Sequence, residues 1–336
     1  MCPDFPVVSA PATPTLRRRH CLLGWAASLV TGCASVGGRA VALIVPAPAG
    51  AAGDSMARAV QPELSRHLGR SVVVENLPGA DGALGSQRVA HAAPDGRTLL
   101  LGSPIELMLT PLGLSQAAYQ PEDLRPVGGF ATTPLVMLAR TSLGVNGVDE
   151  LLRRARKPGS GELRYASAGP GSLEHLLGER FSRSAGLKTH QVPYKHPVPL
   201  LQDLVSGQFD VVFLPWSAPM AEAVAAGQFK ALAVTAPDRS AAPASLPLMK
   251  DIPGLEDFVY SVWTGLQVPY ATPEPVQERL HQACNGLLAL PGLRRVVEAG
   301  GASLAPPRTL AELRQAYLAD ISRYRALARA VGLRIA

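Results

Sequence analysis

Aromatic residues are scarce in this chain of 336 residues: Phe, Tyr and Trp together make up only 5% of it. So few rings argue against a surface on which the bases of single-stranded nucleic acid could stack. The formal net charge of +6 is modest, and basic residues are scattered apart from the run at 17–19. We therefore expect no nucleic-acid partner.

Cysteine is equally rare. Three of the four cysteines, at positions 2, 21 and 33, precede residue 39, so Cys284 is the one that remains in the body of the chain. A single cysteine cannot form an internal disulfide, and no spacing suits a metal cluster, so we expect neither a metal nor a cofactor. The helical pattern around Cys284 predicts that this residue is buried and packs as a small hydrophobic side chain.

Long apolar runs are also missing. The ten residues 21–30 are mostly apolar, which is too short to span a bilayer, and they follow Arg17-Arg18-Arg19. We predict that residues 1–38 are a signal peptide or leader. Val30-Thr31-Gly32-Cys33 is similar to the lipobox of bacterial lipoproteins, which predicts acylation of Cys33. Ordinary cleavage at nearby small residues stays open, as does the choice between general and twin-arginine export.

Catalytic motifs are absent from the sequence as well. It contains no G-x-S-x-G elbow, H-E-x-x-H pair, Walker loop or C-x-x-C pair. The loop with glycines at 50 and 53 lacks the G-x-G core of a dinucleotide site. We expect no enzyme, and an exported hydrolase is the weakest alternative.

What the sequence does contain is a strand–loop–helix unit of small residues. An apolar strand at 41–45 leads into the Pro/Ala/Gly loop 46–53, and Asp54 is the predicted N-cap of the next helix. Backbone N–H groups beside a helix N-terminus suit a carboxylate. Strands at 71–75 and 98–103 complete a βαβαβ pattern, with ligands expected at the carboxyl ends of the parallel strands. The candidate ligand-binding residues are Ala47, Pro48, Ala49, Gly50, Ala51, Gly53, Asp54 and Ser103.

A second unit of the same kind begins at Arg164. Its Gly-rich loop ends at Ser172, which we predict to be an N-cap and a possible ligand contact, as Asp54 is. Trp216 could line the pocket, and Asp210 could stabilise a loop. For His175 a structural role competes with ligand binding, and for Lys195 a counter-charge competes with a solvated surface lysine. The candidates in this unit are Ser167, Ala168, Gly169, Gly171, Ser172, His175, Lys195 and Trp216.

Several short motifs are spaced along the chain: Ala57-Arg58, Glu75-Asn76, Pro78-Gly79-Ala80, Pro94-Asp95-Gly96, Val192-Pro193-Tyr194-Lys195 and Leu201-Gln202-Asp203-Leu204. Together they resemble one family, the Bug receptors, which are the periplasmic solute receptors of tripartite tricarboxylate transporters. The resemblance covers about residues 40–336. The chain departs from the family pattern at Ala47, Ala51 and His196, which suggests a reshaped cleft.

The resemblance implies a periplasmic binding protein-like (type II) α/β fold with two lobes, each built on a mostly parallel sheet, and a ligand cleft between them. Lobe 1 would comprise 39–139 and 264–336, and lobe 2 would comprise 140–263. The implied function is an extracytoplasmic receptor that captures a small organic acid for membrane transporter subunits and works as a monomer. Dicarboxylates, tricarboxylates, acidic amino acids and aromatic acids stay open as ligands. A sensor acting through a membrane signalling partner is the alternative.

Overall fold

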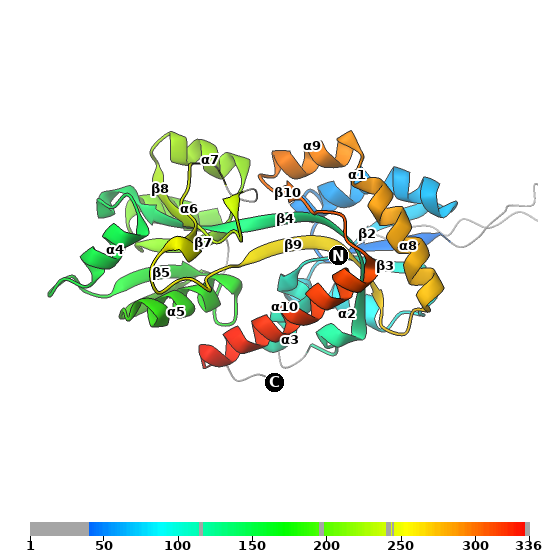
Figure 1. Cartoon of the computed structure of the whole chain (residues 1–336), viewed down its shortest axis with the longest axis horizontal. Helices are drawn as coiled ribbons and strands as arrows, with labels where there is room; N and C mark the ends of the chain where they lie inside the picture. The colour runs from blue at the N-terminus through cyan, green and yellow to red at the C-terminus, as the bar shows by residue number, and fades with distance from the viewer. Residues whose placement is uncertain (1–39, 114–116, 195–197, 240–242, 244, 333–336) are drawn as a thin grey trace, which may run out of the picture. The chain divides into compact units, whose positions relative to one another are not determined.

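The computed structural model describes residues 40–113, 117–194, 198–239, 243 and 245–332. Cys33, Lys195 and the leader therefore lie outside the described residues. Figure 1 shows helices packed around long central strands. The strands are β1 (Val41–Val45), β2 (Val72–Asn76), β3 (Thr98–Gly102), β4 (Leu124–Arg140), β5 (Leu163–Ser167), β6 (Thr189–Pro193), β7 (Val211–Pro215), β8 (Phe229–Val234), β9 (Ser261–Pro269) and β10 (Ser303–Leu304).

The α-helices differ widely in length. They are α1 (Ala52–Leu68), α2 (Ala83–Ala90), α3 (Thr110–Gly113), α4 (Val148–Ala155), α5 (Leu173–Ala185), α6 (Val198–Ser206), α7 (Ala218–Ala225), α8 (Glu274–Leu287), α9 (Pro291–Ala299) and α10 (Leu310–Ala330). Short 3₁₀ or π turns are η1 (Ala80–Gly82), η2 (Ile105–Leu109), η3 (Pro121–Asp123), η4 (Thr141–Leu143) and η6 (Met249–Asp251).

The strands form one mixed sheet in the order β2-β1-β3-β9-β4-β7-β5-β6, with β8 and β10 also paired to β4. At one end β1 runs parallel to β2 and β3, and at the other end β5 runs parallel to β6 and β7. Antiparallel β4 and β9 join these two groups. The fold is therefore α/β with two parallel groups, and each group has a set of carboxyl strand ends at which a ligand can bind.

Strand β4 belongs to both ends of the sheet. Its residues 124–134 pair with β9, and from Leu135 onward it pairs with β7 and, from Val136, with β8. Figure 1 shows β4 and β9 running side by side through the middle of the molecule. The lobe boundaries at 139/140 and 263/264 stay predictions.

The start of helix α1 differs from the prediction that Asp54 caps it. The helix begins at Ala52, and its N-cap is the extended residue Ala51, whose side chain makes no capping bond. Asp54 lies inside the first turn instead. There its carboxylate accepts the N–H of Gly50 at 2.9 Å and so folds the loop back onto the helix. The capping prediction was wrong because the carboxylate of Asp54 accepts an N–H from the preceding loop, at Gly50, and not one of the free N–H groups in the first turn of the helix.

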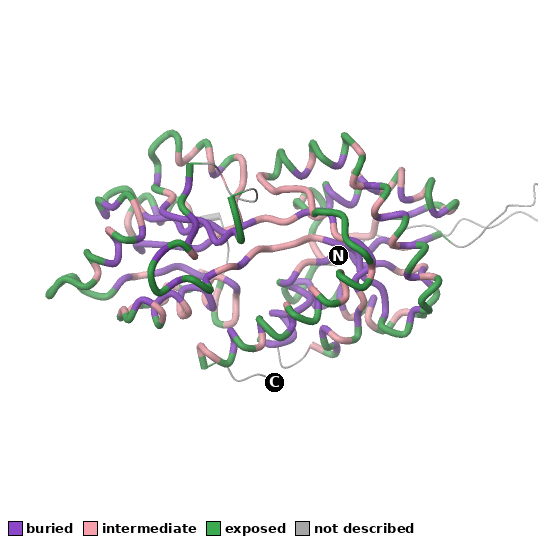
Figure 2. The backbone as a smooth tube through the Cα atoms, in the orientation of Figure 1, coloured by how far each residue is buried: buried purple, intermediate pink, exposed green. Residues whose placement is uncertain are grey.

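Buried apolar side chains lie along the strands and the inner faces of the helices, as the purple segments of Figure 2 show. Cys284 on α8 is 1% exposed, which confirms the prediction, and burial raises the pKa of its thiol to about 12. The last helix, α10, has one continuous buried face, formed by Tyr317, Ile321, Tyr324 and Leu327. Among the described residues, none of the helices has the length and apolar character to cross a membrane.

Candidate functional site

The first loop, residues 46–51, connects the carboxyl end of β1 to α1. Its tip at Pro48, Ala49 and Gly50 is exposed, and its path is fixed from both sides. The side-chain amide of Asn76 donates to the Ala47 carbonyl at 3.1 Å, while Gly50 donates to Asp54. The loop is therefore held in one shape by chain contacts before any ligand arrives.

Asp54 is the internal anchor of that loop. Its Oδ2 accepts both the Gly50 N–H and the Arg58 Nε at 3.0 Å, and its Oδ1 is buried with no partner among the described residues. The hydrogen bonds from Arg58 and Gly50 lower the pKa of Asp54 to about 2. Asp54 is thus a fixed carboxylate that shapes the loop.

Ser103, which follows β3, is hydrogen-bonded to the side chain of Glu106, a residue that the sequence motifs do not single out. The Ser103 N–H and hydroxyl both donate to the carboxylate of Glu106, the hydroxyl at 2.7 Å to Oε2. Burial raises the pKa of Glu106 to about 7, although the bonds from Ser103 act in the opposite direction. No motif points to Glu106, but a charged residue in the apolar run 104–109 was a signal that could have found it.

The second loop, residues 168–172, connects β5 to α5. Ser167 is fully buried, and its hydroxyl accepts the Gly169 N–H at 3.1 Å and the Gln191 amide at 2.7 Å. This pair of bonds fixes the first half of the loop to the sheet. Ala168 and Pro170 are exposed, so the loop presents its backbone to solvent as the first loop does.

Ser172 is the N-cap of α5, as predicted, and its Oγ accepts the His175 N–H at 3.3 Å. The His175 ring serves the loop as well, because its Nδ1 accepts the N–H of Gly171 at 3.1 Å. Burial lowers the pKa of His175, so the imidazole is neutral near pH 7. Burial raises the pKa of Glu174, the residue between them, despite its bonds to Ser172 and Ala168.

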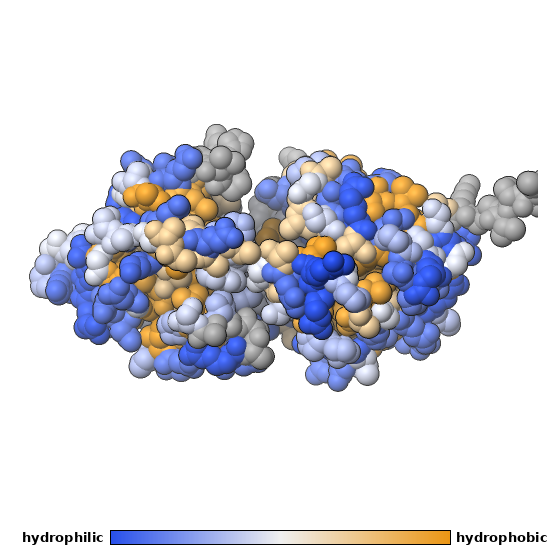
Figure 3. Space-filling model, turned by 90° about the horizontal axis from the view of Figure 1, so that it is seen from above, coloured by the Kyte–Doolittle hydropathy of each residue, from blue (hydrophilic) through white to orange (hydrophobic). Residues whose placement is uncertain are grey.

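The backbone of one parallel group closely approaches that of the other at two glycines. At Gly171 in the second loop, an added Cβ would lie 3.6 Å from the Cα of Gly113 at the end of α3. At Gly301, after α9, an added Cβ would lie 2.6 Å from the Cα of Ser217, the residue after Trp216. Trp216 itself is half-buried against the apolar cluster under β7 and β8. Figure 3 shows the surface hollowed between the two halves of the molecule.

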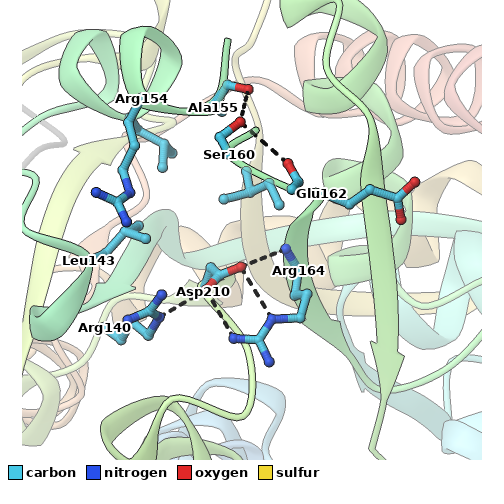
Figure 4. Close-up of a pocket in the computed structure, with 11 residues that line it drawn as sticks. Arg140, Leu143, Arg154, Ala155, Ser160, Glu162, Arg164 and Asp210 are labelled. Atoms are coloured by element: carbon cyan, nitrogen blue, oxygen red, sulfur yellow. Dashed lines mark hydrogen bonds and ion pairs between the residues drawn. The ribbon is translucent and has the colours of Figure 1, made fainter. Parts of the chain in front are cut away.

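The structure gives Asp210 a purely structural place. Figure 4 shows Arg140 and Arg164 directed at its carboxylate, at 2.8 and 3.2 Å, in a pocket of about 180 Å³. Burial opposes ionisation of Asp210, but the bonds from Arg164 and Arg140 outweigh it and lower the pKa. The pocket lies at Leu163 and Asp210, where β5 and β7 begin, whereas ligands bind at the opposite, carboxyl ends.

The predicted residues therefore fall into two groups, one on each parallel sheet. Ala47 to Asp54 and Ser103 surround the ends of β1 and β3, and Ser167 to His175 surround the end of β5. Within the described residues there is no cluster of three or more side chains that could hold a metal. The chemistry on offer is hydrogen bonding from two preformed loops, each placed before the positive end of a helix.

Comparison with known proteins agrees with this geometry. The family described as tripartite tricarboxylate transporter family receptor matches residues 56–332. Protein BugT of Bordetella pertussis is 34% identical over 273 residues, which is 80% of this chain and 81% of BugT. The structure of MatC from Rhodopseudomonas palustris with bound malate superimposes with a TM-score of 0.68 at 30% identity, over 86% of this chain and 98% of MatC.

A second R. palustris protein, solved with adipate, gives a TM-score of 0.71 at 28% identity, over 88% of this chain and 98% of that protein. The fold is thus that of periplasmic binding proteins. Within that class, the chain belongs to the tripartite tricarboxylate transporter receptor family, whose members are solute-binding receptors.

Proposed function

We propose that this protein captures a small carboxylate-bearing metabolite outside the cytoplasm and delivers it to the membrane subunits of a tripartite tricarboxylate-type transporter. The observation that carries the proposal is the pair of strand–loop–helix units. Each places a loop of small residues at the carboxyl end of a parallel strand and before a helix N-terminus, which is a favourable place for an anion.

The ligand class follows from what the loops offer. Residues 46–53 and 168–172 contain no lysine or arginine, and the guanidinium of nearby Arg58 is bonded to Asp54. Hydrogen bonds and helix dipoles, with bridging water, would therefore hold the acid. The malate and adipate that accompany two similar structures are both small carboxylates, which supports this class. Catalysis has no part in this proposal.

Delivery would depend on closure of the two halves around the acid. The predicted lobes, 39–139 with 264–336 and 140–263, would rotate about β4 and β9, and the closed form would be the one that the transporter recognises. Small-angle scattering with and without ligand tests this motion, and a radius of gyration that stays unchanged at saturation would contradict it.

The proposed location rests on the predicted leader, residues 1–38, and on acylation of Cys33. Expression of the full chain in a Gram-negative host, followed by fractionation, tests both points. The wild type should be in the membrane fraction, and Cys33→Ala should appear in the periplasmic fraction. A wild type found in the cytoplasm would overturn the export proposal.

The first experiment is a thermal-shift screen of the chain from residue 39 onward. The panel contains mono-, di- and tricarboxylates together with their amides, because a ligand that binds only the folded state raises the melting temperature by mass action. We expect a shift with at least one acid and none with the fully amidated compound. Arg154→Ala, in the pocket of Figure 4, is the matched control and should keep the response. Silence across the whole panel would overturn the proposed ligand class.

A further inference from the structure

Glu106 lies beside the first loop although the loop sequence does not include it. It is part of η2, directly after β3, and is only 9% exposed. A Cβ added to Gly82 would lie 2.6 Å from the Cβ of Glu106 and 3.3 Å from the Cβ of Pro46, the first loop residue. Gly82 has φ +84°, so glycine permits both the backbone conformation and this close approach. Glu106 is thus placed where β1 and β3 end.

The carboxylate of Glu106 accepts hydrogen bonds from a backbone N–H and a hydroxyl, which are the same kinds of donor that would bind the carboxylate of a ligand. The Ser103 N–H donates to Oε1, and the Ser103 hydroxyl donates to Oε2 at 2.7 Å. Both donors belong to the carboxyl end of a parallel strand, which is the expected ligand position in this class of sheet. At β3 the chain therefore supplies its own anion.

A second buried polar group lies close to Glu106. Gln267 of β9 has no exposed surface, and neither its Oε1 nor its Nε2 has a partner among the described residues. A Cβ added to Gly102 would lie 2.9 Å from the Gln267 Oε1 and 3.3 Å from the Glu106 Oε1, so both oxygens flank the same point. A buried amide without partners is unfavourable, so the end of β3 carries two buried polar groups, one of which has no hydrogen-bond partner among the described residues.

The groups that face Glu106 do not neutralise it. The Tyr119 hydroxyl donates to the backbone carbonyl of Glu106. Burial raises the phenol pKa values of Tyr119 and of Tyr317 on α10, and the negative charge of Glu106 raises them further. η1 contributes Gly82 and the exposed Asp81, and β9 contributes Gln267. Within the described part of the chain, Glu106 has no ion-pair partner, so its charge, when present, is uncompensated.

We propose that Glu106 is the specificity-determining residue of the first loop: it excludes a second carboxylate at the end of β3 and selects a ligand that carries hydrogen-bond donors there. This inference rests on the proposed function, in which the loops hold one carboxylate. The preferred ligands are small monocarboxylates whose other end is an amide, a hydroxyl or an ammonium group. Dicarboxylates would place two like charges side by side in a poorly hydrated site, which is strongly unfavourable.

Matched pairs of ligands test the inference. Succinate and its half-amide succinamate, glutarate and glutaramate, and adipate and adipamate differ in one charge at nearly constant shape. Isothermal titration at about pH 8, where Glu106 is ionised, should give a half-amide affinity about tenfold or more above that of the diacid in at least one pair. Glu106→Gln should bring the two affinities within about threefold, because the like charge is gone.

Controls separate the possible failures. Glu122→Gln, which removes a carboxylate paired with Arg325 on α10, should keep the wild-type preference. If Glu106→Gln does not fold, the wild type at about pH 6 replaces it, since protonation of Glu106 should weaken the preference in the same way. Binding of acids with an unchanged preference in both tests would overturn this inference and leave the receptor function intact. Absence of binding by every acid and half-amide would overturn the proposed function and this inference with it.

Discussion

The backbone N–H of Gly171 donates to Nδ1 of His175 at 3.1 Å. An imidazole nitrogen that accepts a hydrogen bond is unprotonated, so His175 closes the second loop as a neutral ring and gives the site no positive charge. Burial lowers the pKa of His175, which agrees with this role. The sequence left a structural and a ligand-binding role open for His175, and this bond favours the structural one.

Acidification should therefore loosen the second loop. Because the folded pKa of His175 lies below its ordinary value of 6.5, the unfolded chain takes up the proton first, and this contribution to stability is complete above about pH 6.5 and decreases below it. His175→Asn keeps an acceptor for Gly171 and should remove this part of the pH dependence. Urea titrations of both proteins between pH 5 and pH 8 measure it. If the free energy of unfolding changed equally with pH in the two proteins, the proposed role of His175 would be contradicted.

Glu106 should produce the opposite slope in the same range. Its pKa is raised from 4.5 to about 7 in the folded protein, so the folded chain holds the proton longer and stability decreases as the pH rises through about 4.5 to 7. Glu106→Gln should be less sensitive to pH in this window than the wild type. The same urea titrations measure the difference. A variant that matches the wild type at every pH would contradict the buried carboxylate.

Substitutions at two helix N-caps can distinguish an effect on stability from an effect on ligand binding. Ser172 of α5 and Thr309 of α10 each accept a backbone N–H at the start of a helix, at 3.3 and 3.2 Å. Ser172→Ala and Thr309→Ala should each lower the free energy of unfolding by about 1 kcal/mol. If the second loop binds the acid, only Ser172→Ala should also weaken its binding, measured by calorimetry. Equal affinities in the two variants would remove Ser172 from the site.

A new charge at the first loop should have opposite effects on stability and on binding. Ala52 is exposed at the first position of α1, so Ala52→Glu should stabilise the helix by about 0.5 kcal/mol through its dipole. The same charge should weaken acid binding by about tenfold or more. Ala311→Glu, in the exposed first turn of α10, should stabilise similarly and leave binding unchanged. If Ala52→Glu bound the acid as tightly as the wild type does, the acid would have to bind away from the first loop.

Gly178 should be intolerant of any side chain. It lies on α5, and a Cβ there would overlap the buried ring of Tyr165 on β5. Gly178→Ala should destabilise the protein by about 2 kcal/mol or more, because the core has no room for a methyl group. Gly292→Ala on α9, where a Cβ meets open space, should be neutral or stabilise by about 0.5 kcal/mol. Thermal or urea unfolding of the pair checks the contrast.

Local sequence determined the elements of this protein. The apolar run of β1, the small-residue loops after β1 and β5, the cap at Ser172 and the buried face of α10 were all predictable, because each follows from a few neighbouring residues. The family could also be predicted, since its motifs are short and lie within single strand–loop–helix units.

Tertiary structure decided the roles of the polar residues. Whether Asp54 caps its helix or anchors the loop depended on the path of Gly50. The partners of Asp210 lie in β4 and β5, at positions 70 and 46 residues away in the sequence. Glu106 carries no motif, and its importance arises from burial between β3, η1 and β9. Burial and long-range pairing set the charge state of a carboxyl group, and neither is encoded by its immediate neighbours in the sequence.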